Sequence, residues 1–236
     1  MRTIESTGRD RLTRPAYSVA EAGRLARLTS GRVRRWLRGY EYSYGDAVRG
    51  QPPVLQGSGT ESSYASFLDL VDLLFVKRFL DHGVSLQKVR RALDEARRLL
   101  GTDHFARQTF FTDGGSIFLE LQEGARRGRG EAILELMSGG QWVIAPVIRE
   151  LARQIEFESP EGLASRWYPL GQNRPVVLDP TVSFGAPSIA GRGVKTINIH
   201  DLFVAENENL ASVRAWWDLT DDEIQAAVDF ERQLAA

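Results

Sequence analysis

Four arginines within residues 32–38 have the type and spacing for binding a polyanion. Arg32, Arg34, Arg35 and Arg38 fall on one arc of a helix drawn at about 100° per residue, and no acidic residue lies among them. A guanidinium group donates hydrogen bonds in a fork that fits a phosphate group or the edge of guanine. We therefore predict that residues 31–38 form the recognition helix of a DNA-binding unit. The alternative is a basic surface helix that only water covers.

Local signals define the elements that would position these arginines. Ser18 and Glu21 have the spacing of a capping box, which predicts a helix from Val19 to about residue 27. Thr29 or Ser30 is expected to cap the recognition helix. Both residues would lie at the start of this helix, and we expect both to contact DNA. Gly39 is expected to end it. The face opposite the arginines is apolar and consists of Val33, Trp36 and Leu37.

A hairpin is expected beside the two helices. Residues 40–44 alternate with a period of two, and we expect them to pair with residues 53–55 across a loop rich in Gly and Pro. Such a hairpin would be a wing, from which Tyr42, Tyr44 and Arg49 would contact phosphates. Ordinary packing of the hairpin is the alternative for these three residues.

The net charge of -1 conceals a strong separation of charge along the chain. Residues 1–38 hold ten arginines and three acids, a net charge of +7, whereas residues 196–236 hold two arginines and nine acids, a net charge of -7. This asymmetry favours a head that binds nucleic acid and an acidic tail. The chain has no cysteine, which excludes disulfides, thiolate zinc sites and a thiol nucleophile.

Two further helices are predicted, one from residue 66 to about 83 and one from Ser85 to Leu100. Together with residues 18–22 and 33–40, the segment 75–90 resembles MerR-like winged helix-turn-helix domains, and in particular the head of large VapB-type antitoxins. The resemblance implies a homodimer formed through the long helix. Metal sensing is not implied, because this chain lacks the necessary cysteines.

The C-terminal part carries a second resemblance. Residues 179–180, 183–187, 191–194 and 219–230 are similar to a small helical domain of unknown function that recurs in antitoxins adjacent to PIN-domain toxin genes. Members of that group carry arginine where Gly193 stands, and here the arginine is Arg192. A capping box at Thr220 and Glu223 predicts the last helix. Its core residues are expected to be Ile224, Ala227 and Val228.

The toxin-binding segment is not fixed by the sequence, and three residues are candidates. Trp216 and Trp217 are candidates because tryptophan is frequent at interface hot spots, and Arg192 because of the family position beside it. Since neighbouring residues on a helix diverge, one of the two tryptophans is expected to lie in the core.

The chain is therefore predicted to be α+β and mainly helical. We expect a winged helix-turn-helix at residues 15–102, a mixed α/β connecting region with a β-hairpin at 103–170, and a small helical domain at 171–236. The hairpin is expected at residues 109–119, where Asp-Gly-Gly suits a tight turn.

The two resemblances together imply an antitoxin that neutralises a PIN-domain ribonuclease of the VapC type. It would also bind operator DNA and repress its own operon. The alternative is a MerR-like regulator that responds to a ligand and has no toxin partner. The three histidines lack metal-ligand spacing, and no catalytic, cofactor, secretory or membrane-spanning pattern is recognisable. We expect a cytoplasmic protein that is no enzyme, needs no cofactor and does not bind a membrane.

Overall fold

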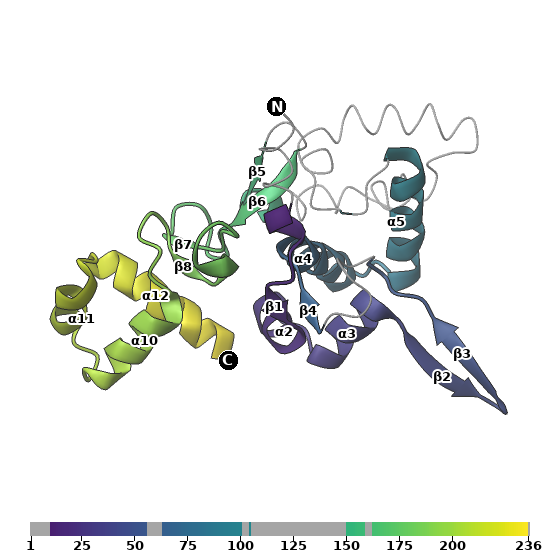
Figure 1. The fold of residues 1–236 in the computed structure, drawn as a ribbon, viewed down its shortest axis with the longest axis horizontal. Coiled ribbons are helices and arrows are strands. Elements are labelled where there is room, and N and C mark those ends of the chain that lie inside the picture. The colour runs from purple at the N-terminus through teal and green to yellow at the C-terminus, as the bar shows by residue number, and fades with distance from the viewer. Residues whose placement is uncertain (1–9, 56–62, 101–103, 105–149, 159–161, 236) are drawn as a thin grey trace. The chain divides into compact units, whose positions relative to one another are not determined.

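The structure is a computed structural model that describes residues 10–55, 63–100, 104, 150–158 and 162–235 (Figure 1). These residues form helices and short antiparallel strand pairs, which confirms the α+β class. The chain divides into two compact units, Met1–Ala152 with Phe157–Ala164, and Arg153–Glu156 with Ser165–Ala236. The hairpin predicted at 109–119 lies outside the described residues, and the three predicted domain ranges stay a prediction.

The N-terminal unit consists of helices joined by tight turns and short strand pairs. The strands β1 and β4 pair with Tyr17 opposite Ala65 and Ser18 opposite Tyr64. The elements in chain order are β1 (Tyr17–Ser18), α2 (Val19–Ala26), α3 (Ser30–Arg38), β2 (Tyr40–Tyr44), β3 (Ala47–Gln51), β4 (Tyr64–Ala65), α4 (Phe67–Asp81) and α5 (Leu86–Leu100).

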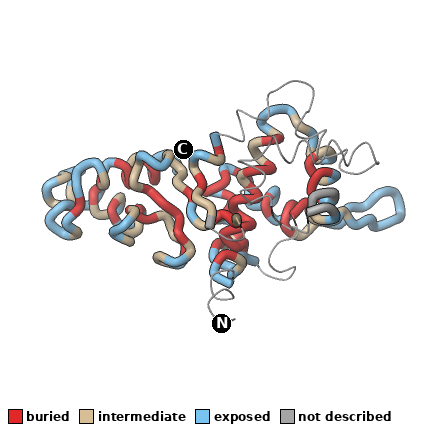
Figure 2. Tube along the Cα trace, turned by 90° about the horizontal axis from the view of Figure 1, so that it is seen from above, coloured by how far each residue is buried: buried red, intermediate tan, exposed pale blue. Residues whose placement is uncertain are grey.

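The core of this unit is built around α4, which is buried along most of its length (Figure 2). The helix begins at a capping box in which Ser66 N donates to Asp69 Oδ2 over 2.8 Å and Asp69 N donates to Ser66 Oγ over 3.1 Å. Its C-terminus is closed by His82, whose Nδ1 lies 2.9 Å from Arg78 O. The predicted position of this helix is thus confirmed, and His82 acts as a cap.

The hairpin pairs differently from the sequence prediction. Strand β2 pairs with β3, so that Tyr44 lies opposite Ala47, and the predicted partner at residues 53–55 is wrong. The reason is local: Gly45 adopts a positive φ of 60°, and with Asp46 it turns the chain at once. The N–H groups of Val54 and Leu55 donate instead to Trp36 O, over 2.7 and 3.0 Å.

The C-terminal unit contains short strand pairs and three helices. Strands β5 (Ile155–Glu158) and β6 (Leu163–Trp167) have residues in both units. The other elements are β7 (Val176–Val177), a 3-10 turn η1 (Ser183–Gly185), β8 (Ser188–Ile189), α10 (Thr196–Ala205), α11 (Leu210–Trp217) and α12 (Asp221–Ala235). Strand β5 pairs with β6, and β7 pairs with β8.

The last helix begins where the sequence predicts. Glu223 N donates to Thr220 Oγ1 over 3.2 Å, and Thr220 N donates to Glu223 Oε2 over 2.7 Å, which completes the capping box. The predicted core residues Ile224, Ala227 and Val228 are fully buried. Helix α12 packs along α10, and the Thr196 hydroxyl donates to the buried Glu231 carboxylate between them.

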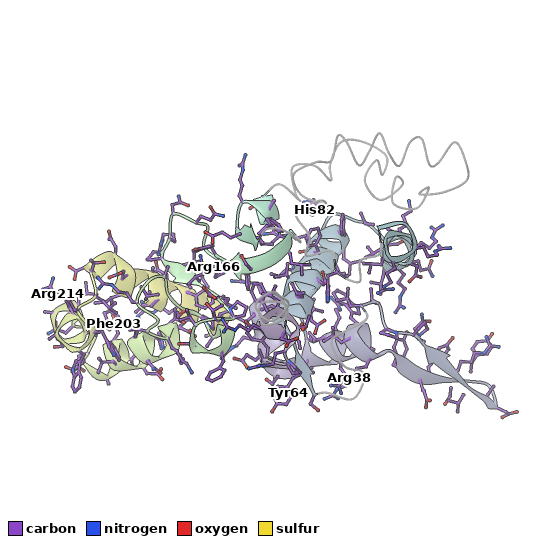
Figure 3. All side chains as sticks on the ribbon, turned by 45° about the horizontal axis from the view of Figure 1, so that its top comes forward. Arg38, Tyr64, His82, Arg166, Phe203 and Arg214 are labelled. Carbon is purple, nitrogen blue, oxygen red and sulfur yellow. The ribbon has the colours of Figure 1, made fainter. Side chains whose placement is uncertain are left out.

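A charged network holds the strands of the C-terminal unit. Arg166, labelled in Figure 3, donates to Asp179 Oδ2 over 2.6 Å and to Glu156 Oε2 over 3.1 Å. Burial by itself would raise the pKa of Asp179, but hydrogen bonds from Thr181 and Arg166 outweigh it and lower the pKa. The carboxylate therefore stays ionised at neutral pH and keeps its partners.

We expect Gly39→Ala to destabilise the N-terminal unit, whereas Gly31→Ala stabilises it. Gly39 has a φ of 74°, and a Cβ there would lie 2.2 Å from Gln51 O. A cost of about 2–3 kcal/mol is expected for such backbone strain. Gly31 lies in α3 with open space around it, so alanine should add about 0.5–1 kcal/mol. Urea denaturation followed by circular dichroism measures the free energy of unfolding of both variants. Equal changes in the two variants would contradict the claim that only Gly39 needs to be glycine.

Candidate nucleic-acid interface

A tight turn at residues 27–29 sets the relation between α2 and α3. Arg27 adopts the left-handed conformation with a φ of 52°, and Leu28 N donates to Gly23 O over 2.8 Å. A Cβ at Gly23 would lie 2.7 Å from Leu28 O, so glycine permits this close approach. Thr29 then caps α3, since its Oγ1 accepts from Arg32 N over 3.3 Å. Two helices are thus joined with almost no intervening chain.

The rotation of α3 about its axis is fixed by its apolar face. Val33, Trp36 and Leu37 are buried, as the sequence predicts. Arg32, Arg34 and Arg35 are exposed on the other side, beside the exposed Thr29 and Ser30. Within the described residues these three arginines form no ion pair, so their positive charge is not neutralised locally. They are therefore available to an anionic ligand.

Arg38 differs from the other three arginines of α3. It is half-buried, and its Nη2 is covered without a hydrogen-bond partner in the part of the chain that the structure describes. Figure 3 labels it near the end of α3, where the chain turns into the hairpin. An unpaired, covered donor is unfavourable unless an acceptor approaches it.

One face of the hairpin is aromatic. Tyr40, Tyr42 and Tyr44 alternate along β2 and share this face, and all three are exposed. The strand register places Arg49 opposite Tyr42, and the Arg49 guanidinium carbon lies 4.8 Å from the centre of the Tyr44 ring. The structure thus brings together Tyr42, Tyr44 and Arg49, the three wing residues that the sequence analysis singled out.

Contacts between rings and guanidinium groups join this face to α3. The Arg35 guanidinium carbon lies 5.9 Å from the centre of the Tyr40 ring, and the Tyr40 and Tyr42 rings are 6.0 Å apart. We call the resulting surface the arginine–tyrosine face. It consists of Arg32, Arg34, Arg35, Tyr40, Tyr42, Tyr44 and Arg49.

The chain after the hairpin is held by α5. Arg90 Nη1 donates to Pro52 O over 2.7 Å and to Pro53 O over 3.0 Å. Burial lowers the pKa of Arg90, while nearby Tyr40 and Asp94 oppose this shift. The hairpin is therefore attached to the unit at both of its ends, through Gly39 and through these carbonyl groups.

The sequence analysis did not single out two arginines beside the turn between α2 and α3. Arg24 and Arg27 are exposed at the end of α2, next to the turn that leads into α3. They contributed to the charge count of the first 38 residues, but a helical wheel of α3 alone could not include them. Their position depends on the left-handed conformation of Arg27.

The three C-terminal candidates lie apart from this face in sequence, and the structure does not group them. Arg192 forms an ion pair with Glu223, with 3.3 Å between Nε and Oε1. Trp216 is 69% exposed and Trp217 is half-buried, so the expectation that one of them lies in the core is wrong. Helix α11 is short and buries Val213 instead.

The described residues contain neither a candidate metal cluster nor a candidate membrane span. No group of three or more His, Asp or Glu side chains among them is arranged to hold a metal ion. Likewise, none of the helices in the described ranges is both long enough and apolar enough to span a membrane.

The relatives of this chain include a protein named as an antitoxin and proteins named as helix-turn-helix regulators. No family model matches the chain. The chain is 26% identical over 223 residues to a Mycobacterium tuberculosis protein named "Putative antitoxin VapB45", covering 91% of this chain and 93% of that protein. It is 33% identical over 99 residues to "Uncharacterized HTH-type transcriptional regulator Rv1830" of the same organism, covering 42% of this chain and 40% of that protein.

A solved structure shares the fold. The crystal structure of Rv2018 from Mycobacterium tuberculosis superposes with a TM-score of 0.66 at 23% identity, and the match covers 92% of this chain and 98% of that chain. This match shows the fold alone. The named relatives support the predicted resemblance at the coarser level of antitoxins and helix-turn-helix regulators.

We expect Thr29→Ala to loosen the first turn of α3. The substitution removes the side-chain oxygen that accepts from Arg32 N, which costs about 1 kcal/mol. Amide hydrogen exchange at Arg32, measured by NMR, should become faster by several-fold. Thr29→Ser retains the hydroxyl and should exchange like the wild type, so equal exchange in both variants would show that the cap does not hold this turn.

Proposed function

We propose that the chain is an antitoxin that neutralises a VapC-type PIN-domain ribonuclease and represses its own operon. The single observation that carries the DNA-binding part is the arginine–tyrosine face, whose arginines on α3 have no ion-pair partner among the described residues. The antitoxin part is supported by similarity, over 91% of the chain, to a protein with that name. The proposed role is non-enzymatic, cytoplasmic and independent of a cofactor.

The proposed DNA-binding unit is a winged helix-turn-helix. Helix α3 enters the major groove, where Arg32, Arg34 and Arg35 contact base edges or phosphates. The β2–β3 hairpin follows the backbone as the wing, with tyrosine hydroxyl groups and Arg49 on phosphates. A phosphate oxygen would also give the covered Nη2 of Arg38 the acceptor that it lacks within the described residues.

A homodimer completes the proposed operator complex. Two recognition helices about 34–36 Å apart would enter successive major grooves of an operator with two half-sites. The neutralising contact belongs to the C-terminal unit in this proposal. Residues 171–236 hold ten acids and five bases, a balance suited to a protein that binds RNA through a cationic surface.

A MerR-like regulator without a toxin is the second candidate. It is favoured by the 33% identity over 99 residues to proteins named as helix-turn-helix transcriptional regulators. Both candidates bind an operator, so the neighbouring reading frame separates them. A PIN-domain gene beside this one favours the antitoxin, and its absence favours the regulator.

Replacing both Arg34 and Arg35 with Ala should weaken operator binding about tenfold or more. The negative slope of log K against log salt should also become shallower by about two. The reason is that one counterion fewer is released for each lost phosphate contact. Mobility-shift titrations at several salt concentrations measure both quantities. The matched control replaces Arg174 and Arg232, which are ion-paired in the C-terminal unit. Unchanged affinity in the Arg34 and Arg35 variant would refute the assignment of α3.

Toxin neutralisation should survive the same two substitutions. Because the proposed DNA and toxin contacts lie in different units, the variant with Arg34→Ala and Arg35→Ala should rescue growth like the wild type when it is co-expressed with the adjacent PIN-domain protein. Colony counts after toxin induction provide the measurement. Loss of rescue, with normal protein levels, would contradict the separation of the two functions.

A further inference from the structure

An exposed phenylalanine in the C-terminal unit sits on a strained turn. Phe184 is 83% exposed. Ser183, Phe184 and Gly185 have consecutive positive φ values of 49°, 58° and 79°. This left-handed region is unfavourable for residues with a Cβ, and strain of this kind concentrates at binding sites. Glycine at position 184 would relieve this backbone strain. The phenylalanine therefore lowers the stability of the chain when no partner is bound.

Hydrogen bonds on both sides hold this turn in place. Thr181 donates from N and Oγ1 to Asp179 Oδ1, over 2.8 and 2.6 Å. Ser183 Oγ donates to Gly193 O over 3.0 Å, and Gly185 N donates to Val182 O over 2.9 Å. The turn is therefore ordered before any partner arrives, which lowers the entropy cost of binding through the Phe184 ring.

The same contacts connect the turn to an acidic pocket. Gly193, which accepts from Ser183, is next to Arg192, whose Nε donates to Glu223 Oε1 over 3.3 Å at the start of α12. Beside this ion pair lies an open pocket of about 410 Å³, and Figure 3 labels one of its residues, Arg214. The lining residues are Arg192, Arg214, Asp218, Leu219, Thr220, Asp221 and Asp222.

The pocket has a surplus of negative charge. Its two arginines are already paired, Arg192 with Glu223 and Arg214 with Asp221. Burial alone would raise the pKa of Glu223, but hydrogen bonds from Thr220 and Arg192 lower it, so the first of these pairs stays charged. The carboxylates of Asp218 and Asp222 form no ion pair within the described residues. The pocket thus suits a lysine or arginine side chain.

We propose that Phe184 and this pocket form one docking surface for the ribonuclease partner. Phe184 would insert into an apolar pocket of the partner, and Asp218 and Asp222 would receive a basic side chain beside it. The inference rests on the proposed function, since an enzyme that binds RNA needs lysine and arginine side chains on its substrate face. An aromatic anchor beside complementary charge is the usual composition of an interface hot spot.

The test compares two substitutions at Phe184 with a matched control. The full-length chain and the PIN-domain protein encoded by the adjacent gene are titrated by calorimetry. Phe184→Ala and Phe184→Gly should weaken binding at least thirtyfold. Val204→Ala shortens another exposed apolar side chain of the same unit and should change the affinity less than threefold. Replacing Asp218 and Asp222 with Asn should weaken binding and reduce its salt dependence.

A thermal denaturation scan separates binding from folding. Phe184→Gly should raise the melting temperature by about 1–3 °C while it weakens binding, because glycine relieves the backbone strain. Operator affinity should remain that of the wild type in both Phe184 variants. A simultaneous loss of stability and operator binding would overturn the proposal, since Phe184 would then have a structural role.

The remaining outcomes are distinct from one another. If the wild type binds the PIN-domain protein and Phe184→Ala binds within threefold of it, the docking surface is refuted and the proposed function stands. If the wild type does not bind the PIN-domain protein, the docking surface and the proposed function are both refuted. Equal weakening by Val204→Ala refutes a contact specific to this turn. If Phe184→Ala lowers the sedimentation coefficient of the chain alone, Phe184 belongs to a contact between copies, which also overturns the proposal.

Discussion

Trp36 is bound to the core of the N-terminal unit through both its side chain and its backbone. The indole is 5% exposed, and its burial with Val33 and Leu37 fixes the rotation of α3. The carbonyl of Trp36 accepts from Val54 N and Leu55 N, which returns the chain to the helix after the hairpin. Because one residue sets both the helix face and the base of the hairpin, the arginines of α3 and the tyrosines of β2 are held on one surface.

Charge is used differently in the two units. In the C-terminal unit, five arginines are engaged in ion pairs, namely Arg166, Arg174, Arg192, Arg214 and Arg232. In α3, Arg32, Arg34 and Arg35 have no such partner among the described residues and contact aromatic rings at most. An exposed ion pair contributes little stability, but it neutralises a cation that would otherwise bind an anion. The arginine–tyrosine face therefore keeps positive charge that no described acidic side chain neutralises.

The local signals in the sequence were sufficient for most helices. Ser18, Thr29, Ser66 and Thr220 each cap the helix that the sequence predicts, because a cap depends on residues only two or three positions away. The periodicity of residues 31–38 likewise predicted which side of α3 is buried. The hairpin shows the limit of such reasoning. The tyrosine strand lies where the sequence predicts, but the two-residue turn at Gly45 and Asp46 pairs it with residues 47–51 and not with residues 53–55.

By itself, the sequence determined the charge separation, the helix starts and the arginine arc, since these follow from composition and from neighbours along the chain. Only the tertiary structure decided which charges are neutralised and which apolar side chains remain exposed. Arg192 and Glu223 are far apart in sequence, and their pairing requires the turn at residue 193 to reach α12. Phe184 is exposed because its left-handed turn is held by Gly193 from a distant loop. Such contacts form between segments that are separated along the chain, and no local sequence pattern specifies them.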